Sequence, residues 1–279
     1  MPADFHFDEI GPWTEIKLDI LREYASAYSR ILTAQKNPSL YHVYIEGFAG
    51  PGVHLSRSTQ EFLPGSPLNA LAVEPPFREY HLIDIDKDKI DTLSQWVGSR
   101  EDVHLYPGDC NKILLEKVFS LVQYRDYRRG LCILDPYGLQ LNWAVILTAG
   151  QMKSIDMFLN FPIFDMNLNV LRRDPERVDA SQIARLNAYW GDESWRPIAY
   201  QTTASLFGPV PEKESNEVVA EAFRQRLRNV AGFERVPEPL PMRNSKGATV
   251  YYLFFASQKG VAEDIVLDIF RKYREPGGG

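Results

Sequence analysis

The sequence predicts an α/β fold in which a seven-stranded, mostly parallel sheet is covered by helices on both faces. Two observations carry this prediction. Short apolar runs alternate with segments of helical periodicity between residues 41 and 161. Near the end of the chain a strand, a turn and a second strand follow one another, which predicts an antiparallel C-terminal hairpin at the edge of the sheet.

Residues 1–40 are expected to form an N-terminal arm and a helix that packs on the core. Residues 1–12 show no periodicity, which indicates an arm. From Thr14, which suits the N-cap position, apolar residues recur on one face of a helix. We expect this helix to end near Asn37-Pro38, because proline restricts the residue before it.

Residues 41–279 are expected to form the α/β domain. Short apolar runs predict its first five strands, at residues 41–45, 81–84, 103–106, 131–134 and 157–159. Between them, helices are expected at about residues 86–98 and 111–124. The pattern breaks after Pro162, and residues 163–214 predict a helical insertion. Beyond the insertion the sequence predicts a helix, a strand, a turn, a strand and a helix, at about residues 215–230, 233–236, 244–247, 250–256 and 260–274.

Composition indicates a soluble globular chain: 44% of its 279 residues are apolar, 24% are charged, and the net charge is −6. No apolar run is long enough to span a membrane, and the N-terminus lacks a secretory signal, so we expect a cytoplasmic protein. The two cysteines, Cys110 and Cys132, are expected to be buried and reduced. The five histidines show no ligand spacing, so we expect no metal.

A glycine-rich loop, Glu46-Gly47-Phe48-Ala49-Gly50-Pro51-Gly52, follows the first predicted strand. Such a turn lets a ligand approach the backbone, and α/β sheets bind nucleotide-like ligands at this edge. The next three strands end on Asp84, Asp109 and Asp135, so we expect these acids to meet the loop at one edge. Asp84 would bind ribose hydroxyls, Asp109 the adenine amino group, and Asp135 would face the reacting methyl group. We expect Asp86 to be only a helix cap.

The loop favours S-adenosylmethionine over a dinucleotide as the cofactor. Its glycines do not fit the spacing G-x-G-x-x-G, and Glu46 suits an ammonium group better than a pyrophosphate. The long segment 53–65 that follows is expected to fold over the cofactor. The residues expected to bind the cofactor are Glu46, Gly47, Phe48, Ala49, Gly50, Gly52, Asp84, Ile85, Asp109, Cys110 and Asp135.

The tetrapeptide Asp135-Pro136-Tyr137-Gly138 resembles the D-P-P-Y signature of methyltransferases that modify exocyclic amines of bases, without its second proline. A carboxylate and a backbone carbonyl can accept both hydrogens of such an amine, and an aromatic ring can stack on the base. A tight turn is the alternative reading. Lys17 on the first helix either reaches the active-site edge or is a surface lysine, and we favour the surface lysine. The catalytic candidates are Asp135, Pro136 and Tyr137, and the substrate-facing candidates are Tyr137, Gly138, Asn160 and Phe161, with a core position as the alternative for Phe161.

The chain also resembles the three-Cys-motif partner protein family. The resemblance rests on Trp13 and Lys17, on residues 44–52, and on three further motifs, which are Gly65-Ser66-Pro67, Leu134-Asp135-Pro136-Tyr137-Gly138 with Trp143, and Asn160-Phe161-Pro162. It extends to Met242-Arg243-Asn244 before Tyr252. The resemblance implies a Rossmann-like class I methyltransferase fold, adenosylmethionine binding, and a link to a partner protein with a three-cysteine motif. It also implies kinship to nucleic-acid adenine methyltransferases.

We therefore expect a methyltransferase whose acceptor is an exocyclic base amine, of the N6-adenine type, in RNA or DNA. Two alternatives remain: a non-catalytic or regulatory partner protein built on the same fold, and a methyltransferase for small molecules or proteins, which the acidic net charge favours. Trp190 and Trp195 suit stacking on a nucleic acid. Between residues 172 and 196, however, five arginines meet five acids, which favours a salt-bridged surface.

Overall fold

The computed structural model describes residues 9–57, 59–205, 208–244 and 246–274. Most of the predicted arm lies outside these residues, and its described end, β1 (Glu9–Ile10), pairs with β3 (Val53–Ser56). The first helix, α1 (Pro12–Ala34), starts two residues before Thr14, with Pro12 at a position where its missing N–H is no loss. None of the described helices combines the length and the apolar character that a bilayer span requires.

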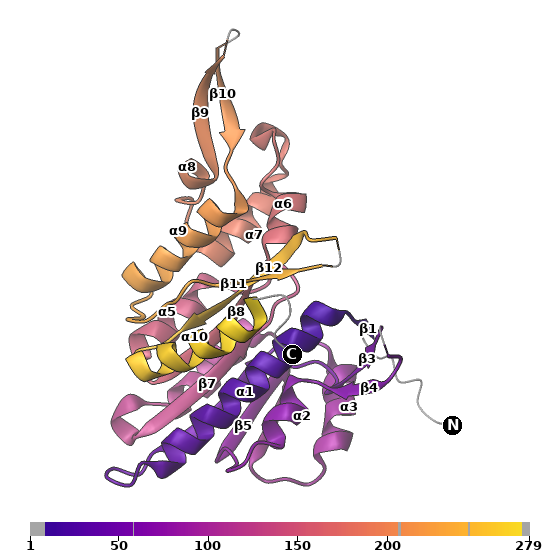
Figure 1. Cartoon of the computed structure of the whole chain (residues 1–279), viewed down its shortest axis with the longest axis vertical. Coiled ribbons are helices and arrows are strands. Elements are labelled where there is room, and N and C mark those ends of the chain that lie inside the picture. The colour runs from indigo at the N-terminus through magenta and orange to yellow at the C-terminus, as the bar shows by residue number, and fades with distance from the viewer. Residues whose placement is uncertain (1–8, 58, 206–207, 245, 275–279) are drawn as a thin grey trace.

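The central sheet has seven strands in the order β11-β12-β8-β7-β2-β5-β6 (Figure 1). Five of them run parallel, whereas β12 runs antiparallel to both of its neighbours. This arrangement confirms the predicted sheet and its C-terminal hairpin. The strands are β2 (Tyr41–Gly47), β5 (Glu79–Asp84), β6 (Val103–Pro107), β7 (Arg128–Leu134), β8 (Ile155–Phe161), β11 (Leu240–Arg243) and β12 (Thr249–Ala256).

The order of the strands reverses at β2. The chain runs outward from β2 through β5 to β6 on one side, and from β7 through β8 to the C-terminal hairpin on the other. Between β2 and β7 the flanking connections therefore diverge, and an α/β sheet leaves room for a ligand at such a point. The glycine-rich loop follows β2 at this position.

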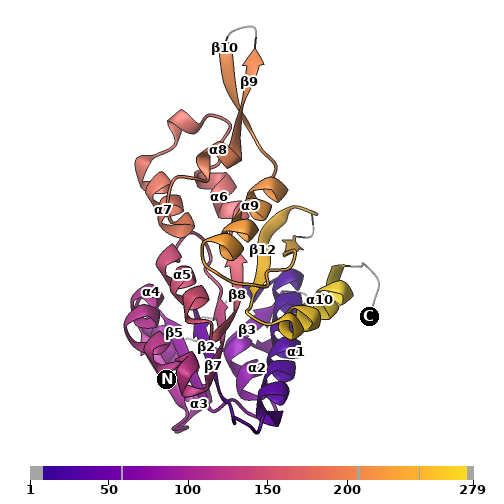
Figure 2. The same ribbon diagram turned by 90° about the vertical axis from the view of Figure 1, so that its left-hand side faces the viewer.

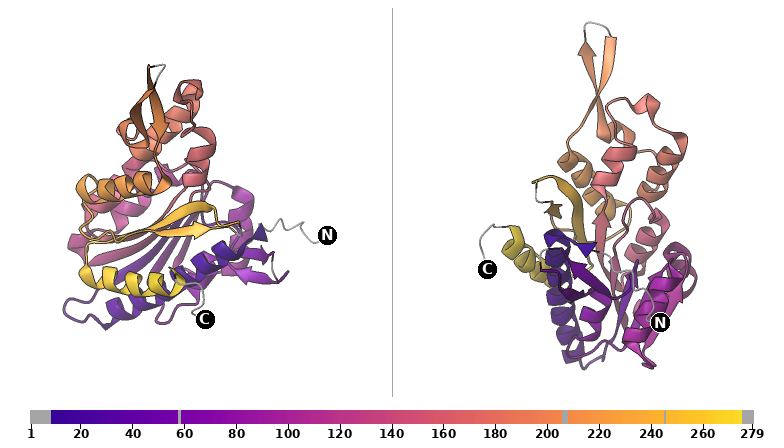
Figure 3. Two further views of the ribbon diagram at one scale, coloured as in Figure 1. Left: turned by 45° about the horizontal axis from the view of Figure 1, so that its top comes forward. Right: turned by 90° about the vertical axis from the view of Figure 1, so that its right-hand side faces the viewer.

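Helices cover both faces of the sheet (Figure 2). One buried cluster joins the sheet to α1, α2 (Ser66–Leu71), α3 (Lys87–Val97) and α10 (Gly260–Arg274), and α1 lies beside α10 (Figure 3). Tyr24 fastens α1 to the sheet, because its ring packs 4.8 Å from that of Phe255. The second cluster joins the other face to α4 (Cys110–Ile113), α5 (Trp143–Met152) and α9 (Asn216–Asn229).

Two predicted elements differ in the structure. The helix expected at 111–124 is α4 followed by a π-helical turn (Leu114–Val118) and a 3₁₀ turn. The strand expected at 233–236 is a loop with one isolated bridge, from Arg235 to Ser257, and the edge strand is β11 instead. Phe233 and Val236 are apolar because they enter the core, so the apolar pattern marks burial there without marking a strand.

The insertion at 163–214 is only partly helical. It holds α6 (Ile163–Asn169), α7 (Ala180–Trp190) and α8 (Arg196–Ala199), and it ends in an unpredicted hairpin. The hairpin strands, β9 (Tyr200–Ser205) and β10 (Gly208–Lys213), project beyond the domain (Figure 1). The prolines of β10 argue against a strand inside a sheet, but both strands of a two-stranded ribbon are edges, which tolerate proline.

Trp190 and Trp195 are buried in the core. Neither ring is therefore available to stack on a nucleic acid, and neither belongs to a solvated surface. The arginines and acids of this region do form ion pairs with exposed partners, such as Arg177 with Asp174 and Arg196 with Glu193.

Gly150 lies where α5 packs closely against the loop after α9. A Cβ atom at this position would collide with the carbonyl group of Ala231, whose carbon would lie 2.8 Å away. We expect Gly150→Ala to lower the free energy of unfolding by about 2–3 kcal/mol, because backbone must move to make room. Urea denaturation measures the change. Gly260→Ala is the matched control, since a Cβ there meets nothing within 4 Å. Equal stability of the two variants would contradict the packing.

Candidate functional site

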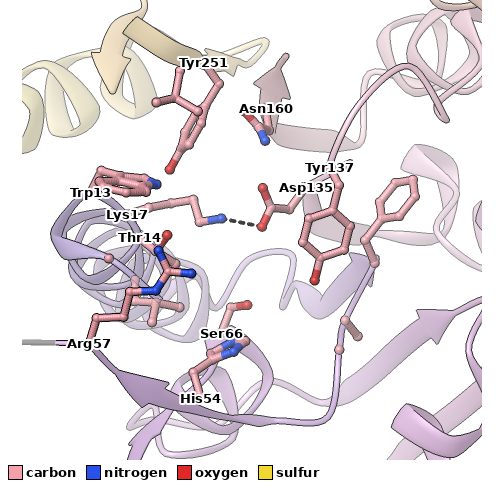
Figure 4. Close-up of a pocket in the computed structure, with 16 residues that line it drawn as sticks. Trp13, Thr14, Lys17, His54, Arg57, Ser66, Asp135, Tyr137, Asn160 and Tyr251 are labelled. Carbon is pink, nitrogen blue, oxygen red and sulfur yellow. Dashed lines mark hydrogen bonds and ion pairs between the residues drawn. The ribbon is translucent and has the colours of Figure 1, made fainter. Parts of the chain in front are cut away.

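A cavity of about 260 Å³ lies at the carboxyl edge of the sheet (Figure 4). Its walls come from α1, the glycine-rich loop, the ends of β7 and β8, and the start of β12. It contains six of the predicted site residues, which are Phe48, Ala49, Gly50, Asp135, Tyr137 and Asn160. The structure thus brings the glycine-rich loop and the D-P-Y-G segment to one hollow.

Lys17 is the main site residue for which the structure overturns the favoured prediction. It was expected at the surface, but its side chain is buried and forms an ion pair with Asp135. Burial alone lowers the pKa of a lysine, but the nearby Asp135 carboxylate outweighs burial, so the pKa of Lys17 lies above its usual range. The spacing held a signal, because Lys17 follows Trp13 by four residues and precedes Ile20 by three, on the apolar face of α1.

Glu46 ends up buried beside the cavity rather than among its lining residues. Its carboxylate accepts hydrogen bonds from the hydroxyl of Tyr44, at 2.8 Å, and from the hydroxyl of Ser66, which does line the cavity. Burial raises the pKa of Glu46 to about 8, although both hydroxyl donors act in the opposite direction. A cation placed next to this carboxylate would restore its charge.

The glycine-rich loop turns sharply and leaves space where it faces the cavity. Phe48 and Gly50 both have positive φ, at 67° and 68°. A Cβ atom on Gly50 would meet nothing within 4 Å, so there is open space beside the backbone at this point of the cavity wall. The N–H of Gly50 donates to the Asp84 carboxylate at 2.8 Å, which ties the loop to the end of β5. The hydrogen bond to Asp84 therefore fixes the loop, while the backbone at Gly50 leaves space for a ligand.

The residues predicted to contact the nucleoside half of the cofactor lie on the same edge but outside the cavity. Asp84 is buried and also accepts from the N–H of Asp86, which caps α3 as expected. Asp109 caps α4 and accepts from Asn111. Ile85 is exposed. Cys110 and Cys132 are both buried, and both are free thiols.

Asp165 of α6 fixes the D-P-Y-G segment, a role that the sequence analysis did not predict. One carboxylate oxygen accepts from the N–H of Leu139 at 3.0 Å and from Arg185 at 3.1 Å. A Cβ on Gly138 would lie 2.6 Å from the same oxygen, so this glycine is needed for close approach. Gly138 thus positions the segment and does not line the cavity.

Asn160 and Phe161 have different roles although they are neighbours in β8. The Asn160 side-chain amide donates to the carbonyl of Pro136 at 3.1 Å and lines the cavity. Phe161 is fully buried, and its ring lies 4.6 Å from that of Phe223. Of the two roles weighed for Phe161, the structure shows the core role, because alternate residues of a strand face opposite sides.

Within the segment 53–65, β3 pairs antiparallel with β4 (Phe62–Pro64), and the two strands form a small sheet with β1. His54 and Arg57, from and just after β3, line the same cavity as Lys17 (Figure 4). The sequence analysis placed the segment over the cofactor site but did not identify either side chain.

Histidines on neighbouring strands also meet at the opposite end of the sheet. Glu79, His81 and His104 place possible ligand atoms within 4.8 Å of one another, a grouping that spacing in the sequence does not reveal. The Glu79 carboxylate in this group is already bonded to Arg128 and Tyr41.

The sequence matches no family model, and no curated protein matches it either. Solved structures do match its fold. Protein LPL1258 from Legionella pneumophila, of the family model DUF519, is 13% identical, covers 93% of each chain and has a TM-score of 0.53. A putative S-adenosylmethionine-dependent methyltransferase from Listeria monocytogenes is 10% identical, covering 86% of this chain and 99% of that chain, with a TM-score of 0.41. Human methyltransferase-like protein 13 in complex with SAH is 13% identical, covering 95% of each chain, with a TM-score of 0.43. The chain has a Rossmann-like α/β fold, which it shares with LPL1258 over 93% of its length.

The raised pKa of Glu46 predicts a pH-dependent stability difference. An unfolded glutamate ionises near pH 4.3, so the folded protein loses stability as the pH rises toward 8 and the buried carboxylate is forced to ionise. We expect Glu46→Gln to gain roughly 3 kcal/mol relative to the wild type between about pH 5.5 and about pH 8.5. Urea unfolding at both pH values measures this difference.

Glu116→Gln, at an exposed position, serves as the control for a charge change of the same kind. Parallel pH profiles of the wild type and Glu46→Gln would show that Glu46 is not a strained buried acid.

Proposed function

We propose that the protein is an S-adenosylmethionine-dependent methyltransferase whose acceptor is an exocyclic amine of a base, of the N6-adenine type, in RNA or DNA. One observation carries the proposal. The Asp135 carboxylate, at the end of β7, and the open backbone of Gly50, after β2, face the same cavity at the point where the strand order reverses. Methyl transfer to a base amine needs an acceptor for the amine hydrogens, which Asp135 offers, and a backbone that the methyl donor can approach, which Gly50 offers.

The residues around the loop suit adenosylmethionine. The direct partners of the buried Glu46 carboxylate are two hydroxyl groups, and the ammonium of the methionine moiety would add a cationic one. The open space at Gly50 admits a ligand against the backbone. Asp84 holds the loop through one oxygen and still has acceptor capacity for ribose hydroxyls. Asp109 stands one strand further along, where the adenine amino group would lie.

Asp135, Pro136 and Tyr137 suit the acceptor. An exocyclic base amine is a weak nucleophile because its lone pair is delocalised into the ring. Acceptors placed around the amine hydrogens localise the lone pair on nitrogen. Tyr137 is 68% exposed at the rim of the cavity, where a ring can stack on an extruded base.

Adenosylmethionine, when bound, would supply an electrophilic methyl group: the acceptor nitrogen would form the N–C bond and lose a proton, and the electron pair of the broken C–S bond would stay on sulfur. The Asp135 carboxylate is the group placed to receive that proton. Lys17 forms an ion pair with Asp135, so a buried ammonium lies beside the carboxylate before the reaction. Asp135 is therefore an acceptor of hydrogen bonds and not a donor.

The resemblance to the three-Cys-motif partner family adds a proposed partner, a protein with a three-cysteine motif. Labelled-methyl transfer from adenosylmethionine to RNA, DNA, protein and metabolite fractions tests the function directly. Label in RNA or DNA supports the proposal, and label confined to protein or metabolites contradicts the acceptor. No label in any fraction, with a stable complex to a partner protein, would favour a non-catalytic role.

Asp135→Asn gives the sharpest test of the assigned chemistry. We expect this variant to bind adenosylmethionine with wild-type affinity by calorimetry but to lose at least ~100-fold in methyl transfer. The double variant Lys17→Met/Asp135→Asn removes the unpaired buried lysine, so loss of transfer in a stable protein can be separated from loss of stability. Asp91→Asn, which breaks an exposed ion pair with Lys87, is the control. Transfer retained by Asp135→Asn would refute the role of Asp135.

A further inference from the structure

Among the cavity-lining side chains that are more than nine-tenths buried, two polar atoms have no hydrogen-bond partner in the described part of the chain. They are the side-chain oxygen Oδ1 of Asn160 and the hydroxyl of Tyr251. A buried polar atom that is left unpaired costs about 1–3 kcal/mol. A ligand that supplies the missing partner offsets this cost. The two atoms therefore indicate which hydrogen-bond donors and acceptors a ligand of this cavity carries.

We infer that Asn160 and Tyr251 select an acceptor in which the amine is attached to a ring carbon next to an unprotonated ring nitrogen. Asp135 and Asn160 Oδ1 accept the two amine hydrogens, and the Tyr251 hydroxyl donates to the ring nitrogen. Adenine presents this pattern at N6 and N1, and cytosine presents it at N4 and N3. The inference rests on the proposed function and adds the residues that read the acceptor.

The orientation of Asn160 fixes which of its atoms faces a ligand. Its NH₂ group donates to the carbonyl of Pro136, at 3.1 Å, and a carbonyl can only accept. The opposite orientation would set two oxygens against each other. Oδ1 is therefore left as an acceptor, and an acceptor-only atom calls for an N–H or O–H on the ligand.

Tyr251 is held where its hydroxyl can reach the same ligand. It lies near the start of β12, which runs antiparallel beside β8, and the hydroxyl points toward Lys17 and Asp135 (Figure 4). Its ring stands 5.6 Å from the Lys17 ammonium. Burial raises the pKa of Tyr251 to about 12, so the hydroxyl keeps its proton and remains a donor at neutral pH. A ring nitrogen with a lone pair is its natural acceptor.

The same wall disfavours an aliphatic amine. A lysine side chain or a free amino acid is protonated at neutral pH and has no ring nitrogen to pair with Tyr251. A cationic amine would also be placed beside the buried Lys17 ammonium, and like charges in a cavity repel. The hydrogen-bonding groups of this cavity therefore favour a base amine over a protein amine as the acceptor.

The test combines a change in the protein with a change in the base. Labelled-methyl transfer is measured on RNA and DNA oligonucleotides that carry adenine or 1-deazaadenine, with 3-deazacytosine against cytosine as the second arm. We expect the wild type to lose roughly tenfold or more when the ring nitrogen is replaced by carbon. Tyr251→Phe should lose a similar factor on the natural base and show no further loss on the deaza base.

Two further variants separate this outcome from a general structural effect. Tyr252→Phe removes the neighbouring hydroxyl, which bonds to Glu217 instead of facing the cavity, and should discriminate like the wild type. Asn160→Ala should slow transfer to both bases equally, because it removes an acceptor for the amine and not the donor to the ring. Calorimetry with adenosylmethionine confirms that each variant retains the cofactor site.

The outcomes distinguish the inference from the function beneath it. Transfer to bases with the same ring-nitrogen discrimination in Tyr251→Phe as in the wild type would overturn the inference and leave the methyltransferase intact. Transfer to neither natural base, together with label in protein or metabolites or in no fraction, would overturn the proposed function and the inference with it.

Discussion

The buried ion pair between Lys17 and Asp135 joins the first helix to the end of a central strand, and the site is built around it. A lysine ammonium removed from water needs an opposite charge beside it, so the register of α1 against β7 is constrained to keep Lys17 in contact with Asp135. Tyr24 lies seven residues further along α1, about 10 Å by the rise of the helix, and it packs on the sheet and supports that register.

The topology explains why acids from distant parts of the chain are useful together. Parallel strands all end at the same edge, so Glu46, Asp84, Asp109 and Asp135 come to one rim although they span ninety positions of the sequence. Their environments then give them different tasks. Glu46 is buried with hydroxyl donors, Asp84 and Asp109 hold backbone at helix and loop starts, and Asp135 is paired with a lysine.

The hairpin of β3 and β4, the helix α6 and the strand β12 shape the cavity from outside the glycine-rich loop. Arg57 and Tyr251 line the cavity, and Asp165 accepts a hydrogen bond from the backbone just after the D-P-Y-G segment. The fold sets the position of the cavity, and these elements set its lining and support.

Local sequence determined the strands, most helices, the glycine-rich loop and the acids at the strand ends, because periodicity and turn chemistry act over a few residues. The tertiary structure alone decided that Lys17 is buried, that Trp190 and Phe161 belong to the core, and that Asp165, Asn160 and Tyr251 surround the D-P-Y-G segment. These are contacts between residues dozens to hundreds of positions apart. They depend on the packing of whole helices and strands, which no short window of sequence contains.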